Sequence, residues 1–146
     1  MPLLARTTVL LLALQGFAAA WSPCVAQQLV ISPRHALSDE VVSIRVTGVG
    51  QGTLVDIRAT RADSAGREWR SVARFRASAA GVVDLSSTAP VEGSYSGVQP
   101  MGLFTSMDLS GELEGKARYP HRWRDTLRTN IVVESDGWTV ARDSLI

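Results

Sequence analysis

The sequence predicts an all-β sandwich of six to eight short strands. Several segments alternate apolar and polar residues with a period of two, which is the pattern of a half-buried strand. Turn-forming residues separate these segments at short intervals, as they do in β-sandwiches. There is no long apolar repeat of 3.6 residues, no internal repeat and no interdomain linker, so we expect one domain.

The first expected strand is the short segment 28–32. Three longer strands follow at 40–46, 53–63 and 68–79, each with a period-two pattern. The residues expected to face the core are Val42, Ile44, Val46, Val55, Ile57, Ala59, Trp69, Ser71, Ala73, Phe75 and Ala77. Residues 82–85 predict a further short apolar strand.

The segments between the strands carry turn signals. "GVGQG", residues 48–52, is expected to form a hairpin turn; a phosphate-binding loop would have to open a helix, and a strand pattern follows instead. Gly66 is free to take a positive φ in the next turn, and Asp136-Gly137 predicts a hairpin within residues 127–145. Residues 110–123 are polar and contain glycine, so they are expected to form a loop.

The N-terminus predicts a signal peptide over residues 1–26, ahead of a β-sandwich domain over residues 27–146. Arg6 precedes an apolar run that is too short for a membrane helix. Cleavage is expected after Ala26, with Ala20 as the alternative. Lipidation of Cys24 is not expected, because bulky Trp21 and the following Ser-Pro replace the small residues of a lipoprotein signal.

Removal of 26 of the 146 residues leaves a mature domain of 120 residues without cysteine, since Cys24 is the only one. Loss of Arg6 leaves 14 basic residues against 14 acidic ones. A neutral domain gives no electrostatic reason to expect nucleic acid as a partner. We expect an exported protein, periplasmic or secreted. The single lysine, Lys116, among many arginines indicates a GC-rich bacterial genome.

The segment "GSYSG", residues 93–97, has the outline of a hydrolase nucleophile elbow. Its centre is Tyr95, however, and the two serines, Ser94 and Ser96, flank that position. Nearby prolines also disfavour the helix that an elbow requires. No catalytic residue is therefore expected, and Tyr95 is expected to bury its ring and hydrogen-bond its hydroxyl.

His35 and His121 each lie in a polar segment beside a proline, and we interpret both as surface residues. Two isolated histidines without cysteine make a poor zinc site, so no metal is expected. Arg70, Arg74 and Arg76 share one face of their strand. We interpret this stripe as a solvated outer face paired with acids.

From about Pro33 to Met107 the sequence resembles the N-terminal domain of the acyl-CoA thioester hydrolase / bile acid-CoA:amino acid N-acyltransferase family. Trp69, Phe75, Gly81 and Asp84 support the resemblance. Its most specific part is the ordered set Gly93, Ser94, Tyr95, Gly97, Pro100, Met101, Gly102, Leu103, Ser106 and Met107.

The resemblance implies an immunoglobulin-like β-sandwich of about seven antiparallel strands. In that family an α/β-hydrolase domain follows and attacks acyl-CoA thioesters; no such domain lies within these 146 residues. The domain is therefore expected to be non-catalytic, without a cofactor, and to meet acyl-CoA or another acyl ester only through its hydrolase partner. The apolar side chains expected to pack against that partner are Tyr95, Met101, Leu103 and Met107, and some of this set is expected to be exposed in this chain. A freestanding exported binding module is the alternative.

Overall fold

The computed structural model describes residues 26–37, 39–109 and 126–146. Residues 1–25 of the expected signal peptide, which include Cys24, lie outside these ranges, as do the expected loop 110–123 and His121 within it. The elements are β1 (Gln28–Ser32), β2 (Ser43–Thr47), β3 (Leu54–Ala62), β4 (Glu68–Arg76), β5 (Val83–Asp84), β6 (Glu92–Gly93), α1 (Gly102–Thr105), β7 (Asp108–Leu109), β8 (Thr129–Ser135) and β9 (Trp138–Leu145).

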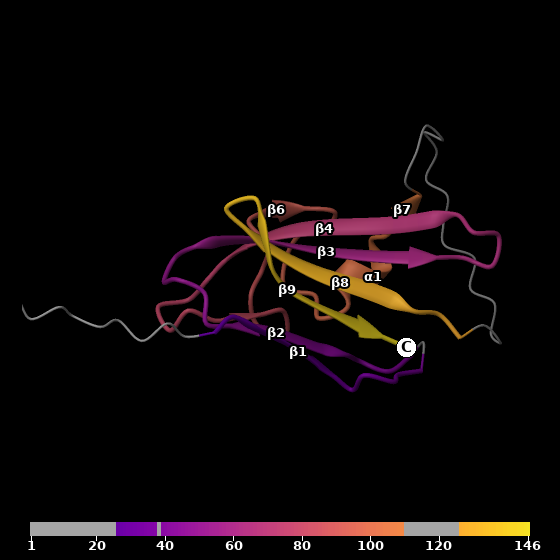
Figure 1. Ribbon diagram of the computed structural model, residues 1–146, viewed down its shortest axis with the longest axis horizontal. Coiled ribbons are helices and arrows are strands. Elements are labelled where there is room, and N and C mark those ends of the chain that lie inside the picture. Colours follow the sequence, from indigo (N-terminus) through magenta and orange to yellow (C-terminus); the bar gives the residue numbers. More distant parts are fainter. Residues whose placement is uncertain (1–25, 38, 110–125) are drawn as a thin grey trace, which may run out of the picture.

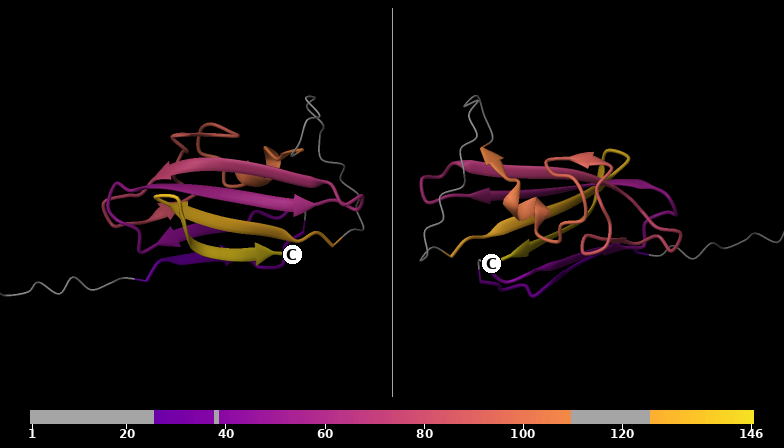
Figure 2. Two further views of the ribbon diagram at one scale, coloured as in Figure 1. Left: turned by 45° about the horizontal axis from the view of Figure 1, so that its top comes forward. Right: turned by 180° about the vertical axis from the view of Figure 1, so that it is seen from behind.

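The strands form two facing sheets, which Figures 1 and 2 show as a lower and an upper layer. The small sheet has the order β1-β2-β5, and the large sheet has the order β6-β4-β3-β8-β9, with β7 also paired to β4. All of these pairings are antiparallel. The predicted all-β sandwich is therefore confirmed. No helix in the described part of the chain is long and apolar enough to span a membrane.

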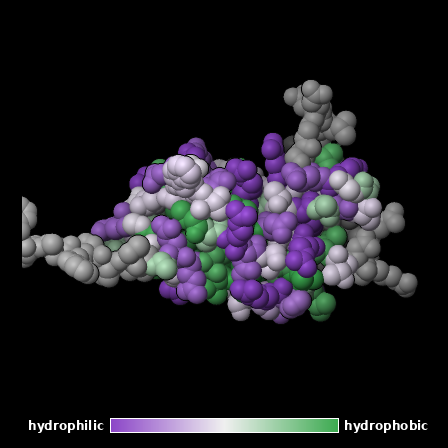
Figure 3. Space-filling view, in the orientation of Figure 1, coloured by the Kyte–Doolittle hydropathy of each residue, from purple (hydrophilic) through white to green (hydrophobic). Residues whose placement is uncertain are grey.

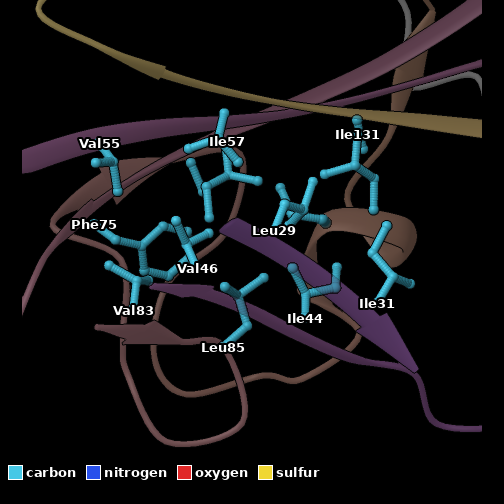
Figure 4. Packing of buried hydrophobic residues seen from close by; sticks show 14 of the residues in the cluster. Leu29, Ile31, Ile44, Val46, Val55, Ile57, Phe75, Val83, Leu85 and Ile131 are labelled. Atoms are coloured by element: carbon cyan, nitrogen blue, oxygen red, sulfur yellow. The ribbon is translucent and has the colours of Figure 1, made fainter. Parts of the chain in front are cut away.

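The core lies between the two sheets. Trp69 and Phe75 are its largest fully buried side chains, and every residue expected to face inward is buried. Figure 4 shows side chains of the small sheet, such as Ile44 and Val46, directed toward Ile57 and Phe75 of the large sheet. Each fully buried side chain of this size stabilises the fold by about 1.5–3 kcal/mol.

The expectation of a hairpin at residues 48–52 is wrong. β2 and β3 belong to different sheets, so this segment crosses from the small sheet to the large one. Val49 is buried on the way, and its N–H donates to the Gly81 carbonyl at 3.3 Å. A Cβ on Gly81, whose φ is +68°, would overlap the Val49 carbonyl. Alternating strands on either side of a turn do not reveal whether the two strands pair.

The two other predicted turns are hairpins. Gly66 has φ +76° between β3 and β4, and Asp136 and Gly137 have φ +51° and +79° between β8 and β9. Two successive positive φ values match a type I′ turn, whose twist suits antiparallel strands.

Asp63 fastens the β3–β4 hairpin. Its carboxylate accepts hydrogen bonds from the Trp69 indole at 3.1 Å, the Arg67 side chain at 2.8 Å and two backbone N–H groups. Burial alone would raise the pKa of Asp63. The hydrogen bonds from Trp69, Arg67 and Ala65 outweigh it and lower the pKa to about 2. The carboxylate thereby fixes the buried Trp69 ring to the turn.

The last strand closes one side of the sandwich against the end of β1. The Ile146 N–H donates to the Arg34 carbonyl at 2.9 Å, and the Ile146 carbonyl accepts from Ala36 at 3.0 Å. The Asp143 carboxylate pairs with Arg34 at 2.8 Å and accepts from the Ser144 N–H at 2.8 Å. A charged side chain on an edge strand discourages pairing with another chain.

Candidate functional site

Residues 93–107 form an excursion from the edge of the large sheet, and we call them the edge excursion. β6 pairs with β4 at Ala73 and Arg74, whereas β7 pairs with the same edge at Trp69 and Arg70. The chain leaves the edge after β6 and returns to it as β7. The two short strands are thus parts of one interrupted edge strand, visible beside β4 in Figure 1.

Ser94 completes the edge where the chain departs. Its N–H donates to the Val72 carbonyl at 2.8 Å, and its hydroxyl oxygen accepts from the Val72 N–H at 3.1 Å. The hydroxyl oxygen is therefore engaged with the backbone of β4. The Ser96 carbonyl accepts from the Gln99 side chain at 2.7 Å, which holds the next turn. The Ser94 hydroxyl and the Ser96 carbonyl of "GSYSG" are therefore both engaged in hydrogen bonds within the domain.

The middle of the edge excursion enters the core. Leu103, on the single-turn helix α1, is fully buried, and Met107 is 6% exposed. The buried Ser71 hydroxyl, on β4, donates to the Leu103 carbonyl at 2.5 Å. Figure 2 shows α1 lying between the large and the small sheet. Leu103 and Met107 therefore belong to the domain's own core, and the expected partial exposure of this set is limited to Tyr95 and Met101.

Tyr95 and Met101 are half-buried against the same core. The Met101 sulfur accepts a hydrogen bond from the Val42 N–H at 3.3 Å, which links the edge excursion to the start of β2. Burial raises the pKa of Tyr95 to about 12. The Tyr95 ring is packed as expected, but its hydroxyl has no hydrogen-bond partner among the described residues, so that part of the expectation fails.

Two glycines of the edge excursion allow close approaches. Gly93 has φ +146°, and a Cβ there would lie 2.6 Å from Cα of Ala73 on β4. A Cβ on Gly102 would overlap the Tyr95 ring. Glycine is therefore needed at the first position for its backbone conformation and for space, and at the second for ring packing.

The described residues bring no catalytic set together around the serines. His35 is exposed in the segment after β1, and the other histidine, His121, lies outside the described ranges. No group of three or more His, Cys, Asp or Glu side chains in the described ranges could hold a metal ion.

The arginine stripe lies on the outer face of the large sheet, as expected. Arg74 pairs with Asp56 at 2.7 Å and with Glu92 at 2.6 Å, and its hydrogen bond to Asp56 lowers the pKa of that carboxyl. Arg76 instead donates to the Gly52 carbonyl at 3.1 Å. Pairing with acids is thus confirmed for Arg74. The face seen in Figure 3 is mostly hydrophilic, with hydrophobic residues in scattered areas.

The sequence is similar to a known protein family and to several curated proteins. Residues 39–137 match the family described as acyl-CoA thioester hydrolase/BAAT N-terminal region. Acyl-coenzyme A amino acid N-acyltransferase 2 of Mus musculus is 45% identical over 80 residues, which cover 55% of this chain and 19% of the mouse protein. Bile acid-CoA:amino acid N-acyltransferase of Homo sapiens is 42% identical over 80 residues, with the same two coverages. Acyl-coenzyme A thioesterase 5 of Mus musculus is 39% identical over 74 residues, which cover 51% of this chain and 18% of that protein.

The matched segment spans about a fifth of each of these curated relatives. The family match itself covers residues 39–137, which include β2 to β8 and the whole edge excursion. The chain therefore belongs to the acyl-CoA thioester hydrolase/BAAT N-terminal region family.

Proposed function

We propose that residues 27–146 are a non-catalytic domain that supports a hydrolase region acting on acyl-CoA thioesters. The observation that carries the proposal is the family match over residues 39–137 to an N-terminal region of thioester hydrolases and acyltransferases. The names of the relatives join acyl-CoA substrates to two outcomes, transfer to an amino acid and thioesterase activity. In this proposal the hydrolase region, and not this domain, determines which of the two reactions takes place.

The contacts of two serine hydroxyls, those of Ser94 and Ser71, support the non-catalytic part of the proposal. A nucleophilic serine needs a base within hydrogen-bond reach and an exposed hydroxyl. The Ser94 hydroxyl instead accepts from the backbone of β4. The Ser71 hydroxyl is buried and donates to Leu103. Both hydroxyls therefore have structural contacts within the domain.

We also propose that residues 1–26 direct export and that the chain is bacterial in origin. The basic residue Arg6 followed by a short apolar run supports export. The relatives named above are from mouse and human, so origin rests on the arginine-rich composition alone. N-terminal sequencing of the exported protein should begin at Gln27; a chain still starting at Met1 in the cytoplasm would overturn the export proposal.

A chimera tests the supporting role. Residues 27–146 would replace the matched segment, and everything before it, in mouse acyl-coenzyme A amino acid N-acyltransferase 2. We expect acyl-CoA turnover at least ten-fold above that of the mouse catalytic region alone. A catalytic region that is equally active alone, or equally active with an unrelated β-sandwich attached, would overturn the proposal.

A further inference from the structure

One end of the sandwich is poor in charge. Segment 48–53 connects β2 to β3 at this end, segment 77–82 connects β4 to β5, and neither contains a charged residue. The two segments lie side by side, because the Gly52 N–H donates to the Ala77 carbonyl at 3.1 Å and the Ala77 N–H donates to the Thr53 carbonyl at 2.9 Å. Charged groups are the costliest to remove from water, so this end tolerates a less polar surrounding.

The β8–β9 turn brings an exposed tryptophan to the same end. Trp138 is 77% exposed, the largest fraction among the large hydrophobic residues of the described ranges. It pairs with Ser135 across the turn, and Ser135 pairs with Val55 near the start of β3. Asp136 and Gly137 hold the turn with positive φ values, so the ring is displayed on an ordered hairpin. We call the two uncharged segments and this turn the tryptophan end.

The chain enters the domain at the tryptophan end. Gln28, the first residue of β1, pairs with Thr47, the last residue of β2. A Cβ on Gly48 would overlap the Ala26 carbonyl, so the chain just before β1 lies against this end. In Figure 1 the start of β1 and the β8–β9 turn lie toward one end of the sandwich, and the C-terminus lies toward the other. The largely apolar residues 9–20 therefore precede, in sequence, the end that displays the tryptophan.

The opposite end of the sandwich has a different composition. Segment 33–40 follows β1 there and contains one arginine and two acidic residues, and the β3–β4 turn, residues 63–67, contains an aspartate and an arginine. The Ile146 N–H donates to the Arg34 carbonyl, so the end of the chain lies on this side as well. The sandwich thus has one end suited to water and one end with few charges and an exposed indole.

We propose that the tryptophan end rests on the surface of a lipid bilayer, with the Trp138 ring among the headgroups. The inference rests on the export role proposed for residues 1–26, and it applies while those residues remain joined to the domain. An apolar segment in the bilayer would hold the tryptophan end at the surface, which makes the contact intramolecular. Tryptophan is enriched at that depth, because its ring is apolar and its indole N–H still reaches polar groups. The contact would direct Ile146 away from the bilayer.

Fluorescence quenching in phosphatidylcholine vesicles tests the contact. Cys24 is the only cysteine, so in a C24S chain a single bimane label can be placed at A79C, in segment 77–82, or at A65C, in the β3–β4 turn. Both positions are exposed, and the nine residues of β4 hold them at least about 27 Å apart. The labelled chain of residues 1–146 would be reconstituted into vesicles that contain phosphatidylcholine with a spin label on its headgroup.

We expect the label at position 79 to be quenched at least about three-fold more strongly than the label at position 65, because only the tryptophan end lies at the headgroups. W138S should remove most of this difference. W138Y should keep most of it, since tyrosine is also enriched at the bilayer surface. Urea midpoints of the same substitutions in residues 27–146 show that each variant folds.

Equal quenching at positions 65 and 79, or a difference that W138S leaves unchanged, would overturn the inference and leave the export role intact. A dimer in solution that W138S abolishes, without quenching at position 79, would assign Trp138 to self-association and also overturn it. Failure of the chain of residues 1–146 to float with the vesicles in a density gradient would overturn both the inference and the export role.

Discussion

Replacement of Leu103 by alanine tests whether the edge excursion is part of the domain's own core. Leu103, on α1, is fully buried, and its carbonyl accepts a hydrogen bond from the buried Ser71 hydroxyl. Removal of a fully buried leucine side chain costs about 3–5 kcal/mol, the sum of lost burial and a residual cavity. The single-turn helix has few contacts of its own with which to close that cavity.

The assay is urea unfolding of residues 27–146, followed by tryptophan fluorescence. With a slope of about 2 kcal/mol per molar urea, the L103A midpoint should fall by about 1.5–2.5 M. Val98 lies in the same segment but is 50% exposed, so V98A should change stability by no more than about 0.5 kcal/mol. Equal midpoints for L103A and the unsubstituted domain would show that α1 does not pack in the core. The edge excursion would then be a surface loop.

Three further predictions follow from the core and the turns. W69A and F75A should each cost about 3–5 kcal/mol in urea unfolding, because both rings are fully buried; an unchanged midpoint for both would contradict the register of β4. Asp63 has a folded pKa of about 2 against an ordinary 3.8, so its contribution to stability is present above about pH 4 and is lost as pH falls toward 2. Urea midpoints from pH 2 to pH 6 should therefore fall less steeply for D63N, and parallel curves would refute this role. G102A should cost about 1–3 kcal/mol by displacing the Tyr95 ring, and much less in a Y95A background; equal costs in both would refute the contact.

The strands were predictable because their burial is periodic. Alternation along residues 68–79 placed Trp69 and Phe75 on the inner face without knowledge of their partners. Sheet membership was less predictable, since a strand that crosses to the other sheet after 48–52 has the same pattern as one that turns back. The outcome depends on distant partners, here Gly81 and Ala77, which hydrogen-bond to the crossing segment.

The burial of Leu103 and Met107 could not be predicted from local pattern. Their segment has no strand or helix period, and its position depends on where β4 leaves its edge open. The mixture of glycine and large apolar residues was visible in the sequence, and it indicated packing without indicating against what.

The most direct test of the central claim, that this domain is not itself the enzyme, is a thioester assay of residues 27–146 alone. Palmitoyl-CoA would be incubated with the purified domain, and free thiol would be measured against a heat-denatured control. We predict no thiol release above the control, because the Ser94 hydroxyl is engaged with the backbone of β4 and no base lies beside it among the described residues. Release above the control that disappears in S94A or S96A, with each variant still folded, would contradict the account.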